Sequence, residues 1–258
     1  MRTSVVLNLK GGVAKTATAV NVAAILASDH KKRVLVVDAD SQCNTTEFFG
    51  GDPDAGNLAE VLRHESDGGR YAVASIQPAN FPGIDLLAGA DSLMDLDLTK
   101  VELQSVQATV LRDMVQRLAD ENAYDYCLVD CPPAFNAASA AALIAADDVI
   151  IPIKLDAFSL RGMTCLLRQI ANMRQINPRL RLAGCLPTMW YKSPKILEGQ
   201  DTLCASGLPV FHPIRRTDKV DEMTFAQDPL LISSPRSAAG VDYRRFVREY
   251  MEGGLING

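Results

Sequence analysis

Short apolar segments alternate with helix-like segments along the whole chain, and this alternation restricts the fold more than any other feature. Strands are predicted over residues 4–9, 33–38, 84–87, 126–130, 149–153 and 181–186. Several of them carry apolar residues at successive positions, as parallel strands covered by helices on both faces do. The pattern predicts an α/β fold, in which a doubly wound, mostly parallel sheet carries helices on both faces.

Length and charge narrow the class of protein. The chain has 258 residues, 48% hydrophobic and 22% charged, so it can bury a core without disulfides or a structural metal. No repeat or linker divides it, and one domain over residues 1–258 is expected, with a looser excursion over residues 51–80. The 26 Lys and Arg against 31 Asp and Glu give a net charge of −5, which excludes a uniformly basic nucleic-acid coat but not a local basic patch.

Features of exported or membrane-spanning proteins are not found in the sequence. The longest uncharged stretch, residues 131–146, contains two prolines and is too short to cross a bilayer. The first residues, MRTSVVLNLK, include no signal-peptide cleavage site. The six cysteines form no CxxC pair, so reduced, buried thiols in a cytoplasmic protein are expected.

A loop suited to phosphate binding follows the first predicted strand. The segment KGGVAKT, residues 10–16, precedes a predicted buried helix over residues 17–27, so backbone N–H groups and the helix N-terminus can surround phosphates. Lys15 is expected to reach the β- and γ-phosphates, and the Thr16 hydroxyl to bind Mg²⁺. A glycine-rich turn with a surface lysine is the alternative. The residues expected to bind nucleotide here are Gly11, Gly12, Val13, Ala14, Lys15, Thr16 and Ala17.

Acidic residues end two of the predicted strands. Asp38 and Asp40 stand at i and i+2, where we expect both to face a crevice beyond the carboxyl ends of the sheet. One of them would hold a metal-bound water and the other would orient a nucleophilic water. Asp130 ends the strand in LVDCPP and would support Mg²⁺. Each motif alone also fits a turn or a helix cap, but their order after the glycine-rich loop favours a nucleotide site.

These three segments resemble a known family. KGGVAKT, VVDADSQCN and LVDCPP look like the deviant Walker A, switch I and Walker B segments of the ParA/MinD family of P-loop ATPases, and ParA/Soj-type partition proteins are the most similar group. The resemblance covers nearly the whole chain, including SPRS at residues 234–237 before a terminal helix. It implies ATP and Mg²⁺ as cofactors, slow hydrolysis that a partner stimulates, and a homodimer that forms on ATP binding.

The resemblance also implies roles for single residues. The family's signature lysine maps onto Lys10, which would reach the phosphates bound by the partner subunit as an arginine finger does. Asp40 maps onto the residue that positions the attacking water. Ala14 stands where the family more often has glycine, and its extra methyl group is tolerated where φ is negative. The implied catalytic residues are Lys10, Lys15 and Asp40, and the residues assigned to Mg²⁺ are Thr16, Asp40 and Asp130.

By the same resemblance, the nucleotide base lies near Thr188, Met189 and Pro213. A guanine-reading motif needs Asn or Thr before K-x-D, and the segment DKVD, residues 218–221, has Asp there, which favours ATP over GTP. Partition ATPases bind DNA nonspecifically through basic residues in matching regions, and structural ion pairs with nearby acids are the alternative role. The candidate DNA contacts are Arg215, Arg216, Lys219 and Arg236.

The resemblance points to a cytoplasmic, nucleoid-associated switch that positions a chromosome, plasmid or other cargo with a ParB-like or cargo-adaptor activating protein. Two alternatives remain. One is a MinD-like membrane-surface ATPase, because Tyr243, Phe246, Val247, Tyr250 and Met251 form an apolar face on the terminal helix. Acidic residues interrupt its basic flank, which favours docking onto the protein and no stable membrane insertion. The other alternative is a small-molecule kinase or ligase on the same scaffold.

Overall fold

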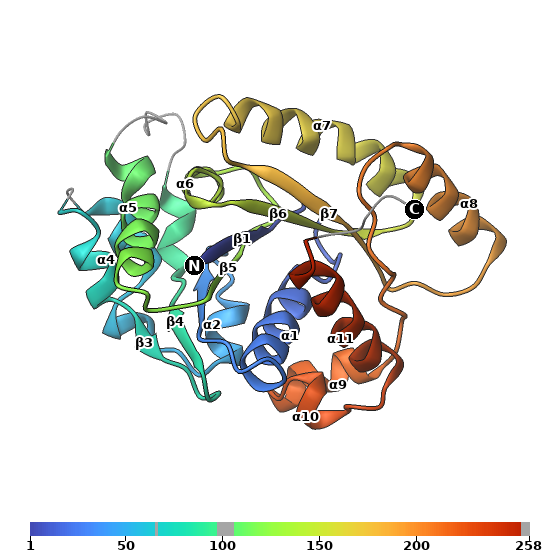
Figure 1. Cartoon of the computed structure of the whole chain (residues 1–258), viewed down its shortest axis with the longest axis horizontal. Coiled ribbons are helices and arrows are strands. Elements are labelled where there is room, and N and C mark those ends of the chain that lie inside the picture. Colours follow the sequence, from blue (N-terminus) through green and yellow to red (C-terminus); the bar gives the residue numbers. More distant parts are fainter. Residues whose placement is uncertain (65–66, 97–105, 254–258) are drawn as a thin grey trace.

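Parallel strand pairing organises the structure, a computed structural model that describes residues 1–64, 67–96 and 106–253. Within these residues the strands form one sheet in the order β3-β4-β2-β5-β1-β6-β7 (Figure 1). All neighbours pair in parallel except β3, which pairs antiparallel with β4 at the edge. The strands are β1 (Arg2–Val6), β2 (Val34–Asp38), β3 (Gln77–Pro78), β4 (Ile84–Leu87), β5 (Tyr126–Asp130), β6 (Asp148–Lys154) and β7 (Arg181–Thr188).

Helices cover both faces of this sheet, because successive strand residues alternate between two apolar clusters. In β2, Val34 and Val36 belong to one cluster while Leu35 and Val37 belong to the other. One face carries α1 (Lys15–Ser28), α2 (Asn44–Phe48), α9 (Lys219–Ala226), α10 (Leu230–Ser233) and α11 (Ala238–Met251). The other carries α3 (Leu58–Arg63), α4 (Arg70–Ala74), α5 (Val106–Asp120), α6 (Ala137–Ala145), α7 (Ala157–Met173) and α8 (Pro194–Ala205).

The predicted fold class is confirmed, and several boundaries differ. The strands predicted over residues 84–87 and 126–130 have the observed bounds, whereas the first strand is Arg2–Val6 and not residues 4–9. The looser excursion predicted over residues 51–80 is wrong, since α3 buries Leu58 and Val61 in the core. The expectation of buried thiols fails for Cys165 and Cys204, which are exposed.

The terminal helix docks onto the protein, as its interrupted basic flank predicts. Tyr243, Phe246, Val247 and Tyr250 of α11 are each at most 1% exposed and belong to the same apolar cluster as α1. The Tyr250 hydroxyl also contacts the Ser4 hydroxyl of β1. In the part of the chain that the structure describes, helices long and apolar enough to cross a membrane are not found.

Candidate nucleotide site

The loop between β1 and α1 leaves open space where the sequence predicts phosphates. A Cβ atom added at Gly11 or Gly12 would meet no atom within 4 Å, and Gly12 has a φ of +68°. Ala14 takes the left-handed conformation, with φ 63° and ψ 38°. The negative φ that would tolerate its methyl group is therefore not observed. This conformation costs an L-residue about 1–2 kcal/mol. Contacts elsewhere in the fold must therefore stabilise the loop against the backbone preference of Ala14.

Lys15 is the first residue of α1, directly after this loop, and its side chain is almost completely buried. Its Nζ donates a hydrogen bond to the Lys10 carbonyl oxygen at 3.3 Å. Burial lowers the pKa of Lys15, and the nearby carboxylates of Asp130 and Asp40 oppose the shift. A cation held in this environment is suited to an anionic ligand, because a phosphate would replace the lost hydration.

Asp130 ends β5 beneath the loop with its carboxyl group only partly satisfied. The Thr16 and Thr45 hydroxyls each donate to its Oδ2 at 2.7 Å. Its Oδ1 is buried and has no hydrogen-bond partner among the described residues. Burial, with the neighbouring charge of Asp38, raises the pKa of Asp130 to about 7. A hydroxyl and a carboxylate with a spare oxygen form a donor set that fits Mg²⁺ and its waters.

Asp38 and Asp40 lie close together, because the Asp40 N–H donates to Asp38 Oδ1 at 3.1 Å, but their side chains differ in burial and in their other partners. Asp38 is fully buried, accepts hydrogen bonds from the Thr46 backbone and hydroxyl at 2.8 Å each, and lies in register with Asp130 across β2 and β5. Burial raises the pKa of Asp38 to about 6, although the Thr46 hydrogen bonds oppose the rise. Asp40 lies in the following loop, where its Oδ1 accepts from the Gln42 N–H at 3.1 Å.

Gly89 lies two residues after the end of β4 and packs against Asp38 and Thr46. A Cβ atom there would lie 3.1 Å from Asp38 Cγ, and the Gly89 N–H donates to the Thr46 hydroxyl at 2.8 Å. A side chain at position 89 would require Asp38 and the Asp40 carbonyl to shift by a few tenths of an ångström. Neither Thr46 nor Gly89 was among the predicted site residues, because no motif in the sequence links them to Asp38.

Lys10 is bound within its own protomer. Its Nζ lies 2.8 and 2.7 Å from the two carboxylate oxygens of Asp156 and 3.0 Å from the Ser159 hydroxyl. Asp156 is also the N-cap of α7 and accepts from the Ser159 N–H at 2.9 Å. Although partial burial opposes the shift, hydrogen bonds from Lys10 and Ser159 lower the pKa of Asp156 to about 2. Asp156 was missed by the sequence analysis, since a lone acid before a helix reads as a cap.

A cavity of about 310 Å³ lies beside Ala14 where the base is predicted. Thr188 and Met189 line it, and the Thr188 hydroxyl donates to the Val13 carbonyl at 3.1 Å, joining the end of β7 to the phosphate loop. Pro213 is not among the lining residues, whereas the adjacent Ile214 is.

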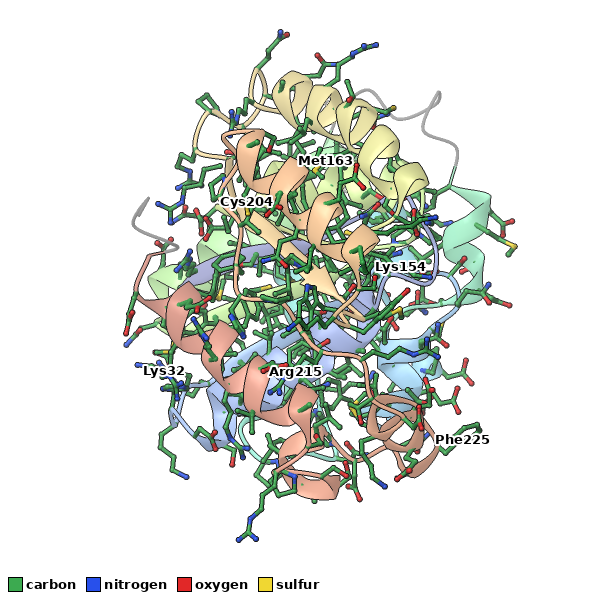
Figure 2. The ribbon with its side chains drawn as sticks, turned by 90° about the vertical axis from the view of Figure 1, so that its right-hand side faces the viewer. Lys32, Lys154, Met163, Cys204, Arg215 and Phe225 are labelled. Carbon is green, nitrogen blue, oxygen red and sulfur yellow. The ribbon has the colours of Figure 1, made fainter. Side chains whose placement is uncertain are left out.

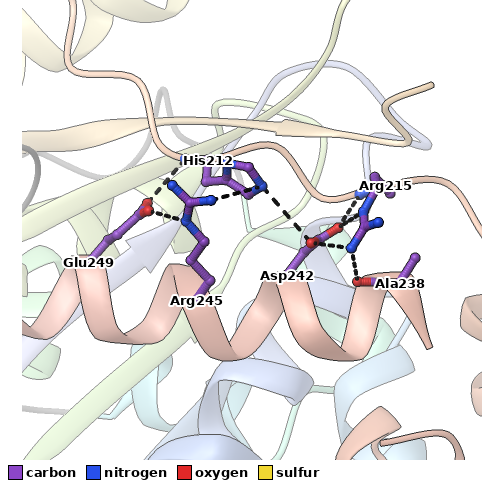
Figure 3. A network of polar contacts seen from close by, with 6 residues as sticks. All are labelled: His212, Arg215, Ala238, Asp242, Arg245 and Glu249. Carbon is purple, nitrogen blue, oxygen red and sulfur yellow. Dashed lines mark hydrogen bonds and ion pairs between the residues drawn. The ribbon is translucent and has the colours of Figure 1, made fainter. Parts of the chain in front are cut away.

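The candidate DNA contacts differ in their surroundings. Arg215 donates two hydrogen bonds of 2.9 Å to the buried Asp242 of α11, in the network that Figure 3 shows. Lys219 pairs with Glu222 on α9. Arg216 and Arg236 are exposed, and their side chains make no hydrogen bond or ion pair with another residue that the structure describes. Arg215 lies near the centre of the face in Figure 2.

Comparisons with known proteins agree with this geometry. Residues 1–182 match the family model of an AAA domain. The chain is 32% identical to the chromosome partitioning protein ParA of Caulobacter vibrioides, over 96% of this chain and 93% of that protein. A cobyrinic acid a,c-diamide synthase from Mycobacterium smegmatis with bound ADP and magnesium is 28% identical, with a TM-score of 0.80 over 98% of this chain and 94% of that one. The McdA–ATP complex of Cyanothece has the same fold, with a TM-score of 0.82 and 22% identity. The match covers 100% of this chain and 99% of that chain.

Proposed function

The chain belongs to the ParA/MinD family of P-loop ATPases, and from this premise we propose that it is an ATP-dependent switch that dimerises, binds DNA without sequence preference and positions a cargo. ATP and Mg²⁺ are its cofactors, by likeness to the relatives that carry them. The observation that carries the proposal is the phosphate loop with buried Lys15 above the half-satisfied Asp130. We assign the whole of residues 1–258 to one such ATPase domain.

The chemistry follows from the placement of these side chains. Bound Mg²⁺ would supply charge neutralisation at the phosphates, with Thr16 and Asp130 as the groups that hold it and its waters. Lys15 would bind the β- and γ-phosphates, and Asp40, whose side chain is only partly buried in the loop after β2, would align the attacking water. Lys10 of a partner subunit would complete the site. A group supplied in trans is worth about 10³-fold or more in rate, so turnover is slow without an activating protein.

Dimerisation tests the role of Lys10. We expect Lys10→Ala to lose the ATP-dependent dimer in light scattering, while Lys15→Ala loses nucleotide binding altogether. A normal ATP-dependent dimer of Lys10→Ala would remove the assignment in trans.

DNA binding tests the rest of the proposal. Retardation of unrelated DNA fragments should require ATP, show no preferred sequence and weaken steeply with salt, because contacts to phosphates release counterions. Lys15→Ala should abolish it and Arg216→Ala should weaken it. Retardation that is equal with ADP, or a footprint at one preferred site, would contradict a nonspecific DNA switch.

The membrane-surface alternative is less well supported. Its apolar helix face would have to leave the core, where Phe246 and Tyr250 are fully buried. Flotation with anionic liposomes and ATP should leave the protein in the unbound fraction.

A further inference from the structure

A second groove opens at the amino ends of the strands, on the side of the molecule away from the phosphate loop. The last turn of α1 with the connection to β2, the turn before β4, and α10 form its walls, and its volume is about 530 Å³. It shares no lining residue with the base cavity. Because the phosphate loop follows the carboxyl end of β1, and β1, β5, β2 and β4 pair in parallel, the two sites lie at opposite edges of the sheet.

Helix α1 separates the groove from the phosphate site. Lys15 at the phosphate loop is its first residue, and Ser28, which lines the groove, is its last. With a rise of 1.5 Å per residue, the helix holds its two ends about 20 Å apart. Figure 2 shows the same separation, since Lys32 of the groove extends at the edge of the molecule, well apart from Lys154 of the base cavity. A ligand in the groove would therefore leave the nucleotide site open.

The floor of the groove is apolar. Phe81 is 9% exposed and belongs to the same apolar cluster as α1, and Leu231 packs against that cluster. Ile232 beside it is 52% exposed. The Val34 N–H donates to the Gly83 carbonyl at 3.0 Å, which fixes the turn before β4 against β2. The groove is thus a fixed recess whose apolar surface the described residues leave uncovered.

The charged residues that line the groove are Lys31, Lys32 and Arg33. The ammonium groups of Lys31 and Lys32 make no hydrogen bond or ion pair with another residue that the structure describes. Arg33 lies 3.7 Å from the Asp125 carboxylate. A hydrogen bond from the Arg33 N–H, together with the charges of Arg33 and Lys32, lowers the pKa of Asp125. One carboxylate thus faces three cations, and an excess of positive charge remains beside the apolar floor.

Lys31 carries its charge in an unfavourable backbone conformation. Its φ is 55°, in the left-handed region that favours glycine. The turn closes α1, since the Lys32 N–H donates to the Leu26 carbonyl at 3.0 Å. Asp29 in the same turn is bound by Arg244 at 2.8 Å and does not neutralise Lys31. Glycine at position 31 would therefore remove the charge and relax the backbone together.

The combination of recess and charge selects the kind of ligand. DNA phosphates would use the cations but not the apolar floor. A membrane takes up apolar side chains that protrude from a helix face, whereas Phe81 lies recessed. A protein segment with carboxylates around an apolar side chain uses both features, because the anchor fills the recess and the acids meet the lysines.

We propose that this groove is a docking site for a partner protein that presents an apolar anchor side chain flanked by Asp or Glu, and that the partner stays bound in every nucleotide state. Lys31, Lys32 and Arg33 complement its charge, and Phe81 and Ile232 receive the anchor. The docking site lies outside the nucleotide site, so the proposal does not depend on the proposed function.

Peptide binding tests the groove directly. A labelled peptide with Leu flanked by Glu is titrated against the full chain by fluorescence anisotropy, beside one peptide with Ser in place of Leu and one with Lys in place of Glu. The site variants are Lys31→Glu, Lys31→Gly and Ile232→Ser. The matched controls are Lys195→Glu and Leu197→Ser, both exposed on α8. Phosphatidylglycerol vesicles and unrelated DNA are tested with the same proteins.

We expect the Leu–Glu peptide to bind, with affinities within about twofold of one another without nucleotide, with ADP and with ATP. Lys31→Glu and Ile232→Ser should weaken binding at least about tenfold, as loss of a complementary charge or an anchor contact does. Each control should stay within about twofold. Lys31→Gly should weaken binding while it raises the urea midpoint of unfolding, so its loss of affinity cannot come from loss of folding.

Several results would overturn the proposal. They are no binding of the Leu–Glu peptide, equal binding of either control peptide, and equal binding by the site variants. An affinity that differs more than about tenfold between ADP and ATP would place the groove within the nucleotide switch and overturn it as well. Vesicle or DNA binding that requires Lys31, without peptide binding, would assign the cations to those ligands instead. Peptide binding by a chain that neither hydrolyses ATP nor retards DNA would refute the proposed function, while the docking site itself would stand.

Discussion

Ala14 has a backbone conformation that glycine adopts more easily, with φ at 63°. Ala14→Gly should therefore raise the free energy of unfolding by about 1 kcal/mol, because the methyl group no longer opposes the left-handed turn. Urea unfolding with an unchanged m-value would measure this. Ala171→Gly, on the exposed side of α7, is the control and should lower stability by about 1 kcal/mol. A loss of stability in both variants would contradict the strained geometry.

Asp130 makes the stability of the metal-free protein depend on pH. Its pKa is raised to about 7 in the folded state, so its contribution is fully present below the unfolded pKa near 4 and is lost as pH rises through 7. Denaturation in EDTA should show the free energy of unfolding falling by more than about 1 kcal/mol between pH 5 and 8. Asp130→Asn should flatten this slope and abolish ATP turnover. An unchanged slope in Asp130→Asn would assign the effect elsewhere.

Residues of the site were predictable where a short motif marks them, as at the phosphate loop and at Asp130, which ends an apolar strand. Lys15 and Thr16 lie in one short loop whose chemistry is evident from the sequence. The partners of Asp38 and Lys10 come from Thr46, Gly89 and Asp156, which the fold brings together from separate segments. Their pairing depends on strand register and helix placement, which no local pattern specifies.

At the N-terminus of α7, Asp156 and Ser159 bind the Lys10 ammonium group. Asp156→Asn keeps the helix cap, because Asn caps as well as Asp, but removes the charge that holds Lys10. Because this ion pair is only partly buried, its loss should cost less than about 1 kcal/mol of stability. ATP-dependent dimers should then form at several-fold lower protein concentration in sedimentation experiments, with Asp201→Asn on α8 as the charge control. Dimerisation identical to the unaltered chain would show that this contact does not restrain Lys10.

Packing of α11 contributes strongly to stability. Phe246 is fully buried and meets Phe211 edge-on, with ring centroids 4.8 Å apart. Phe246→Ala should lower the free energy of unfolding by about 3–5 kcal/mol, measured by chemical denaturation. Val241→Ala on the exposed side of the same helix should change it by less than about 0.5 kcal/mol. Equal small effects would mean that the helix is not docked in solution.

Elements with strong local patterns were predictable, and short ones were not. β5 is an apolar run that ends clearly at Asp130, β4 has apolar residues at three of its four positions, and the terminal helix has a long apolar stripe. β3 has two residues at the edge of the sheet, and α3 has six, so neither repeats a pattern often enough to be detected. Tertiary contacts with the sheet, and not local preference, stabilise these segments.

At the scale of the whole molecule, the proposed DNA binding requires a restricted basic surface, because the net charge of the chain is −5. Arg216→Ala should change the free energy of unfolding by less than about 0.5 kcal/mol. It should also reduce, by about 1, the slope of the logarithm of the DNA-binding constant against the logarithm of the salt concentration. Arg215→Ala should instead lower stability by about 1–3 kcal/mol, because it leaves the buried Asp242 carboxylate without its guanidinium. DNA retardation at several salt concentrations, together with urea unfolding, distinguishes a DNA-contacting arginine from a structural one. A stable Arg215→Ala with a reduced slope would assign Arg215 to DNA.

The order of strands also affects how this protein emerges from the ribosome. β1 and β2 are not neighbours, since β5 lies between them and pairs with both. While the first 125 residues are being synthesised, the two oldest strands have no central partner, and the phosphate loop has no Asp130 beneath it. Nascent chains arrested before residue 126 should therefore be sensitive to protease and in need of chaperones, and the ability to hold nucleotide should be acquired late in translation.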